Sequence, residues 1–118
     1  MVLNNFNPRP HCNLFNVHIM SNGVISASVA LCEGRHDIPE ARDGAIFHQI
    51  EDPSDIPALE RHAASVIKAT HVNDLTVYVT GLTQALAATL NACRVYGVTV
   101  TLMHYNSATG KYVSQPMI

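Results

Sequence analysis

The stretch that decides the fold covers residues 75–115, LTVYVTGLTQALAATLNACRVYGVTVTLMHYNSATGKYVSQ. Its first six residues alternate apolar and polar side chains, which is typical of a half-buried strand. Residues 84–96 are strong helix formers with an apolar stripe at helical spacing, and residues 98–103 alternate again. A strand, a helix and a strand joined by short links predict a βαβ unit with two parallel strands and a right-handed crossover.

Turn-forming residues mark the ends of these elements. Gly81 breaks the first strand, and Thr83 is the expected N-cap of the helix. Gly97 occupies the position where a helix end favours a left-handed residue. Residues 106–110, Asn-Ser-Ala-Thr-Gly, predict the turn of an antiparallel hairpin in which Gly110 supplies a positive φ.

The first half of the chain predicts three strands and a helix. Residues 11–20 and 24–31 alternate on either side of Ser-Asn-Gly, a strong hairpin signal, and residues 44–50 form a short third strand. Asp55 is the expected N-cap of a helix that ends near Thr70, with Pro57 in its first turn. The predicted order is βββαβαββ: a two-layer α/β fold with a mixed sheet and both helices on one face. We expect a single domain over residues 1–118, with residues 1–10 as a loose N-terminal arm.

Composition favours an oligomer. The 118 residues are 47% hydrophobic and 14% charged. The charged fraction is well below the roughly 25% of typical globular domains.

The predicted helices cover only the Val/Leu face of the sheet. The other face, with Thr76, Tyr78, Thr99 and Thr101, would then meet a second sheet, another subunit or water. We therefore expect a homo-oligomer.

Several classes of function lack their sequence signature. The net charge is −2 and the seven Lys and Arg residues are scattered, so we expect no nucleic-acid groove. No apolar run approaches the ~18 residues of a membrane span, and the first ten residues do not resemble a signal peptide. Three cysteines without CxxC spacing indicate reduced thiols in a cytoplasmic protein. The seven histidines lack metal-binding spacing, so we expect neither a metal nor a cofactor.

A ligand site is predicted beyond the carboxyl ends of the two parallel strands, where open α/β sheets bind ligands. The helix N-terminus there attracts anions, and an aromatic ring beside it could stack on a base. Two groups of residues are expected to converge there. They are Thr80, Gly81, Leu82, Thr83 and Gln84 after the first strand, and His104, Tyr105 and Asn106 after the second.

Each of these features also has an ordinary structural explanation. The Thr-Gly-Leu-Thr segment is also a common strand-to-helix connection, in which Thr83 only caps the helix. Cys93 follows the apolar stripe and is expected in the core, and His62 is most simply a hydrogen-bonded, partly buried histidine. Arg35 and Arg42 flank an exposed loop, and in an oligomer they could bind phosphate in a neighbour's pocket.

Residues 77–117 resemble two groups of small proteins, on the strength of Thr80, Gly81, Thr83, His104 and Tyr105 and of the layout around them. One is the CRISPR-associated group that binds or degrades cyclic oligoadenylate, whose Rossmann-like halves place a Thr/Gly turn after a central strand. The other comprises phage proteins that sequester the cyclic ADP-ribose signals of Thoeris defence. The resemblance implies an oligomer that binds a nucleotide-derived signal, in a phage or mobile-element setting.

Three hypotheses follow. The first is a non-enzymatic oligomer that captures a small anionic nucleotide ligand, such as a cyclic nucleotide or an ADP-ribose derivative. The second is a metal-independent cyclic-nucleotide phosphodiesterase in which His104 acts as general acid or base. The third is a structural or interaction protein that uses the Thr/Tyr face of the sheet and binds no small ligand.

Overall fold

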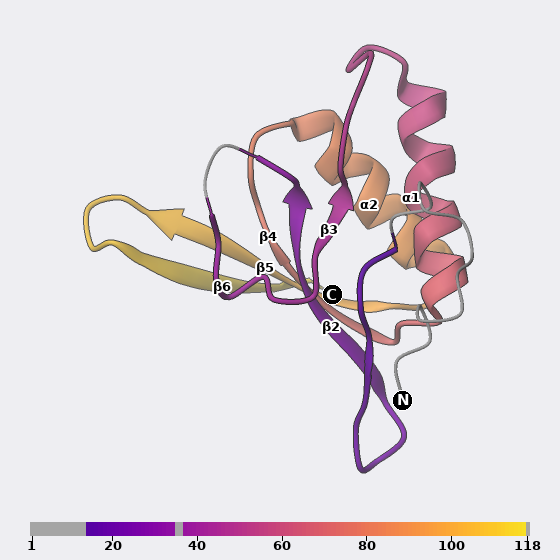
Figure 1. The fold of residues 1–118 in the computed structure, drawn as a ribbon, viewed down its shortest axis with the longest axis vertical. Helices are drawn as coiled ribbons and strands as arrows, with labels where there is room; N and C mark the ends of the chain where they lie inside the picture. The colour runs from indigo at the N-terminus through magenta and orange to yellow at the C-terminus, as the bar shows by residue number, and fades with distance from the viewer. Residues whose placement is uncertain (1–13, 35–36, 118) are drawn as a thin grey trace.

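The computed structural model describes residues 14–34 and 37–117. The predicted arm of residues 1–10, together with His11, Cys12 and Arg35, lies outside the described residues. The elements follow the predicted order and confirm the two-layer α/β fold (Figure 1). They are β1 (His18–Ile19), β2 (Ile25–Cys32), β3 (Ala45–Phe47), α1 (Ile56–Thr70), β4 (Asp74–Tyr78), α2 (Thr83–Val95), β5 (Thr99–Asn106) and β6 (Lys111–Met117).

All the described strands belong to one mixed sheet with β4 at its centre. The strand order is β1-β2-β4-β5-β6, and β3 also pairs with β2. β2, β4 and β5 are mutually parallel, as predicted for the βαβ unit, and β1–β2 and β5–β6 are antiparallel. The N-terminal half of β2 pairs with β1 through Ser26, and its C-terminal half pairs in parallel with β3 through Ala30 and Cys32. Two strands therefore share one side of β2.

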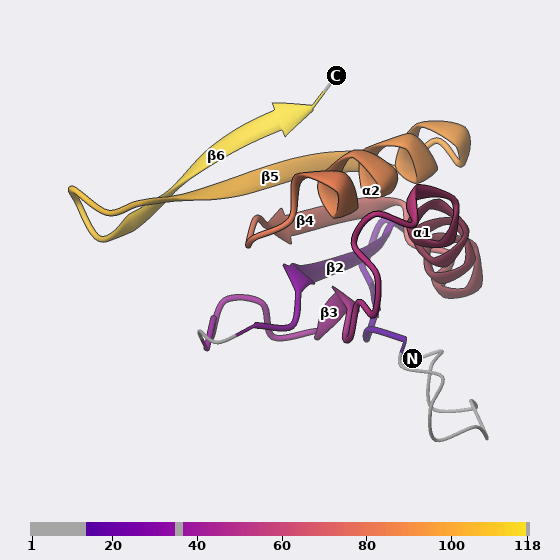
Figure 2. The ribbon, with the colours of Figure 1, turned by 90° about the horizontal axis from the view of Figure 1, so that it is seen from above.

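Both helices cover the same face of the sheet, as predicted (Figure 2). The side chains of Leu75 and Val77 in β4 point to this face and are fully buried among inward-facing residues of α1 and α2. The alternation of β4 places Thr76 and Tyr78 on the opposite face. Tyr78 is nevertheless only 9% exposed, because the ring of Tyr112 packs edge-on against it at 4.9 Å between centroids.

The helix ends confirm one predicted cap and correct another. Asp55 caps α1 by accepting a hydrogen bond from the Ala58 N–H at 3.2 Å. Thr83 is not the N-cap of α2: Leu82 holds that extended position and makes no side-chain cap hydrogen bond, and Thr83 is the first helical residue. The Leu82 carbonyl already accepts the Leu86 N–H, so the helix begins one residue earlier than predicted. Gly97 follows α2 with φ of 68°, as its position predicted.

Two predicted strands are shorter than expected. Of residues 11–20, only His18–Ile19 form a strand among the described residues, and of residues 44–50 only Ala45–Phe47 do. The backbone N–H of Asn16 donates to the carbonyl of Asp43 in the loop before β3, so this part of the chain does not pair with β2. The apolar alternation still predicted burial correctly, since Phe15 and Val17 are each 1% exposed.

Neither helix in the described part of the chain is long and apolar enough to cross a membrane.

Candidate functional site

The direction of the chain reverses between β2 and β4. From β2 it passes to β3 on one side, and α1 then carries it back across β2 to β4 on the other side. β5 and β6 continue in this second direction (Figure 2). Ligands of open α/β sheets bind beyond the carboxyl ends of parallel strands, at such a switch point. The fold therefore places the favoured ligand position beside the ends of β2 and β4.

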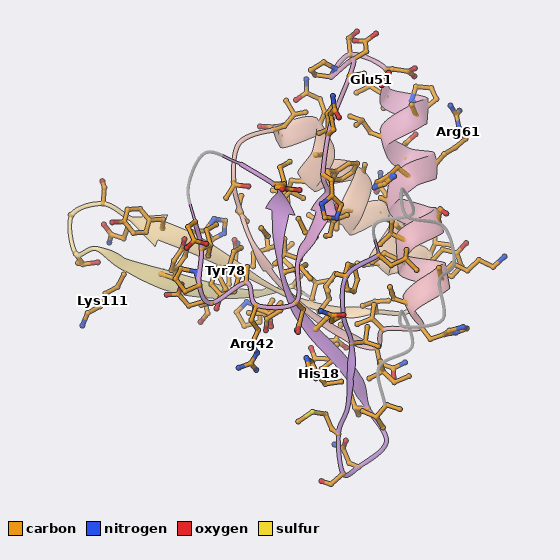
Figure 3. All side chains as sticks on the ribbon, in the orientation of Figure 1. His18, Arg42, Glu51, Arg61, Tyr78 and Lys111 are labelled. Carbon is orange, nitrogen blue, oxygen red and sulfur yellow. The ribbon has the colours of Figure 1, made fainter. Side chains whose placement is uncertain are left out.

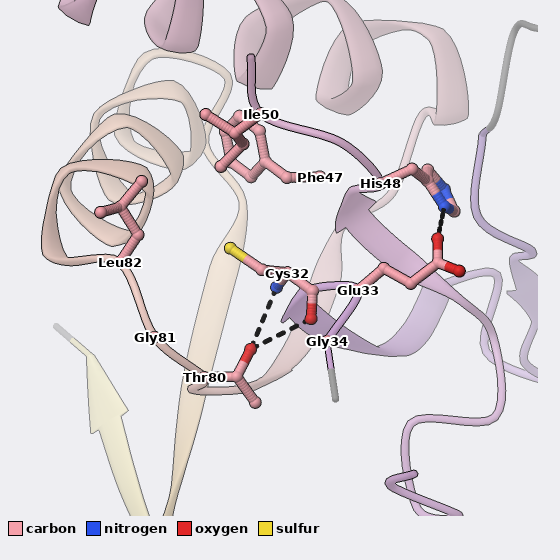
Figure 4. A pocket seen from close by; sticks show the side chains of 9 residues that line it. All are labelled: Cys32, Glu33, Gly34, Phe47, His48, Ile50, Thr80, Gly81 and Leu82. Carbon is pink, nitrogen blue, oxygen red and sulfur yellow. Dashed lines mark hydrogen bonds and ion pairs between the residues drawn. The ribbon is translucent and has the colours of Figure 1, made fainter. Parts of the chain in front are cut away.

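A cavity of about 470 Å³ lies at this position (Figure 4). Its volume falls within the ~300–1,000 Å³ of typical small-molecule sites. The walls are formed by residues at the ends of β2 and β3 and by the segment that connects β4 to α2. The lining residues are Cys32, Glu33, Gly34, Phe47, His48, Ile50, Thr80, Gly81 and Leu82.

The side chain of Thr80 joins the ends of β2 and β4 under the cavity. Its hydroxyl accepts a hydrogen bond from the Cys32 N–H at 3.2 Å and donates one to the Cys32 carbonyl at 3.1 Å (Figure 4). The side chain thus continues the β2–β4 pairing after β4 has ended at Tyr78. This bond pair fixes the spacing of the two strand ends that form the cavity.

The thiol of Cys32 points toward the start of α2 (Figure 4). Burial raises the pKa of this thiol, and a hydrogen bond from the Leu82 N–H partly offsets that effect. The thiol therefore stays protonated at neutral pH and adds no negative charge to the cavity. The first N–H groups of α2 have no acceptor within the helix, as in any α-helix, and no cap side chain accepts a hydrogen bond from them.

Gly81 leaves the wall of the cavity open at the approach to α2. Its φ is 72°, a conformation that favours glycine, and a Cβ built on it would meet no heavy atom within 4 Å. A ligand can therefore approach the backbone closely, next to a helix N-terminus that attracts negative charge.

A histidine–carboxylate pair lies on the opposite side of the cavity. The Nδ1 atom of His48 and Oε2 of Glu33 are 2.6 Å apart (Figure 4). Buried polar atoms almost always have a hydrogen-bond partner, but Nε2 of His48 is buried and has none among residues 14–34 and 37–117. A second cavity, of about 770 Å³, also borders Glu33 and His48. The pair therefore borders both cavities, and Nε2 of His48 has no hydrogen-bond partner among the described residues.

Three of the eight predicted ligand-binding residues line the first cavity: Thr80, Gly81 and Leu82. Thr83 and Gln84 are exposed in the first turn of α2 and are not among its lining residues. The ligand-binding role of all eight residues stays a prediction.

The other three, His104, Tyr105 and Asn106, lie in the part of β5 that continues past the end of β4, and they do not line this cavity. His104 is hydrogen-bonded through Nε2 to Oε1 of Gln115 at 2.7 Å. Tyr105 is 58% exposed and packs on Tyr112. Because β5 stays extended through Asn106, His104 and Tyr105 point to opposite faces of the sheet and cannot line one rim together.

The sequence reasoning missed the residues from β2 and β3, notably Cys32, Glu33, Phe47 and His48. The sequence analysis placed the site between the ends of β4 and β5, the two strands of the βαβ unit. The cavity instead lies between the ends of β4 and β2. The available signal was the helix between β3 and β4. A helical crossover indicates parallel strands, so the carboxyl end of an N-terminal strand could have been expected at the same edge.

Other predicted residues have simpler roles. Nε2 of His62 donates to the Ile46 carbonyl at 2.8 Å, which confirms the predicted hydrogen bond, but His62 is exposed and not partly buried. Cys93 is 1% exposed in the core, and burial raises the pKa of its thiol to about 12. Arg42 is exposed. Burial raises the pKa of the Tyr78 phenol, and the positive charge of Arg42 lies close enough to lower it in part (Figure 3). Within the described ranges no three His, Cys, Asp or Glu side chains gather in a way that could hold a metal ion.

No protein-family model, no curated protein and no solved structure matches this chain. The function must therefore be inferred from the cavity and from the sequence itself.

Proposed function

We propose that this protein is a binding module for a small, nucleotide-derived anion, which occupies the cavity beside the ends of β2 and β4. The observation that carries the proposal is the place of this cavity: it lies at the switch point of the sheet and next to a helix start without a side-chain cap. The ligand class is a cyclic nucleotide or an ADP-ribose derivative, as in the proteins that residues 77–117 resemble. The free thiols of Cys32 and Cys93 are consistent with a protein of the cytoplasm.

The two ends of the cavity suit different parts of such a ligand. Phosphate belongs at Gly81, where the backbone is open, beside the positive N-terminus of α2. The Glu33 carboxylate would repel phosphate but accepts hydrogen bonds from ribose hydroxyls, as an acidic residue at a strand end does in dinucleotide-binding folds. Phe47 and Ile50 supply an apolar wall for a base.

Thermal unfolding of the full chain with a ligand panel tests the proposal. The panel contains cyclic oligoadenylates, cyclic dinucleotides, cyclic ADP-ribose isomers and ADP-ribose. A ligand present at a hundred times its dissociation constant adds about 2.7 kcal/mol of stability, which for a domain of this size raises Tm by about 10 °C. If no member of the panel shifts Tm, the proposed function is wrong.

A matched pair of variants locates the binding site. Glu33→Gln removes the carboxylate at the cavity, whereas Glu60→Gln makes the same change on the exposed surface of α1, away from the cavity. We expect only Glu33→Gln to weaken binding. Chromatography of the ligand after incubation then separates capture, which returns the ligand intact, from cleavage, which would favour a phosphodiesterase.

A further inference from the structure

The outer edge of β6 is long and open. β6 pairs only with β5 among the described strands, in an unbroken register from Lys111 to Met117. The β5–β6 hairpin projects beyond the helices (Figures 1 and 2). The opposite side of the sheet ends in strands of two and three residues. Proteins commonly protect sheet edges with short strands, charges or proline. β6 is seven residues long and carries one charge, Lys111 at its first position (Figure 3), and one proline, Pro116 near its end.

The hydrogen bonds of β5 determine which backbone groups of β6 are free. The Met103 carbonyl accepts the Val79 N–H at 3.0 Å, and the Thr99 N–H donates to the Asn73 carbonyl at 2.8 Å. The backbone groups of Thr99 and Met103 thus point toward β4. Because these directions alternate along a strand, Leu102 and the other even-numbered residues of β5 point toward β6.

The register then identifies the outward-facing residues of β6. Ser114 is opposite Met103, so its N–H and carbonyl point away from β5. The same holds for Tyr112 and Pro116, which are opposite Tyr105 and Thr101. Proline has no N–H, so Pro116 loses no hydrogen bond to β5 at such a position. The open edge therefore presents two N–H donors, from Tyr112 and Ser114.

We propose that β6 is a homodimer interface, in which two copies pair antiparallel about a two-fold axis at Ser114 and extend the sheet across both subunits. Ser114 then donates its N–H to the carbonyl of Ser114 of the partner subunit, and Tyr112 donates to the carbonyl of Pro116 of the partner subunit. Every outward N–H of β6 gains an acceptor, and the two copies do so equally, as a two-fold axis requires.

Charge also favours a second copy at this edge. In the proposed register Lys111 lies opposite Met117 of the partner subunit, so the two ammonium groups are at opposite ends of the paired strands and do not repel each other. The remaining residues of β6 are uncharged. Val113, which is 53% exposed in the single chain, comes beside Gln115 of the partner subunit, which covers one side of its side chain.

Native mass spectrometry and light scattering of the full chain over a range of concentrations test the proposal. We expect a species of twice the 12.8 kDa chain mass. Ser114→Pro removes an N–H that β5 does not use, so it should give a folded monomer. Ser114→Lys should also give a monomer, because it places two ammonium groups together at the axis. The control Ser107→Lys, in the hairpin turn, should stay dimeric.

Amide hydrogen exchange gives a readout that a merely structural role of β6 would not produce. In the dimer the Tyr112 and Ser114 amides should be protected at high concentration and exchange faster on dilution. The Val113 amide, which is bonded to β5, should be insensitive to dilution. A wild-type chain that stays monomeric at all concentrations would overturn the proposal. So would a Ser114→Lys variant that remains a dimer, or protection that grows at Val113 instead of Ser114.

Discussion

Replacement of Thr80 by valine should destabilise the protein by about 2 kcal/mol. Valine has nearly the same shape but cannot make the two hydrogen bonds of the Thr80 hydroxyl to the Cys32 backbone, at 3.2 and 3.1 Å. Each such bond contributes about 0.5–1.5 kcal/mol net, so the pair contributes about 1–3 kcal/mol. Both residues are half-buried, so water only partly replaces the lost bonds.

Urea unfolding followed by circular dichroism measures this effect. With a slope of roughly 2 kcal/mol/M, the midpoint should fall by about 1 M. Thr83→Val is the matched control, because Thr83 is exposed and does not cap α2. Thr80→Ser should lose little, since it keeps the hydroxyl. If Thr80→Val and Thr83→Val agree within about 0.5 kcal/mol, the hydroxyl of Thr80 does not hold the two strand ends together.

Two further predictions concern other buried groups. The carboxylate of Asp43, which is 4% exposed, accepts the Ser28 N–H at 2.8 Å and is hydrogen-bonded to His18 at 2.6 Å. In urea unfolding, Asp43→Ala should therefore lower the free energy of unfolding by about 2–3 kcal/mol. Asp37→Ala, at an exposed position of the same loop, should leave it almost unchanged. Burial raises the pKa of the Cys93 thiol from 9.0 to about 12, so above pH 9 the unfolded chain releases a proton that the folded chain keeps. From pH 8 to pH 10 the wild type should consequently lose about 1 kcal/mol more stability than Cys93→Ala. Parallel pH profiles of the two proteins would contradict the buried, protonated thiol.

The fold was largely predictable because its elements carry local signals. Alternation identified β4 and β5, and Gly97 and Gly110 have the positive φ that their positions predicted. Asp55 caps α1 as expected from its place before Pro57. Each of these signals depends on neighbours in the sequence, and neighbours in the sequence are neighbours in space whatever the rest of the chain does.

The site was less predictable because it depends on which strands pair. The sequence shows that β4 ends at a Thr-Gly turn, but the residue opposite Thr80 across the sheet is Cys32, which is distant in the chain. Nothing local to Glu33 or His48 indicates that they meet. The prediction for His104 and Tyr105 also assumed that β5 ends near Met103, whereas hairpin pairing with β6 keeps the chain extended to Asn106.

The position of β2 between three partners restricts how this chain can vary in length. Loss or gain of one residue inside Ile25–Cys32 would exchange the buried and outward faces of the strand and break its pairing with β1, β3 and β4 at once. The loop at residues 37–42 and the turn at residues 107–110 have no such constraint. Relatives of this protein, when aligned with it, should therefore show gaps at those two places and none in β2.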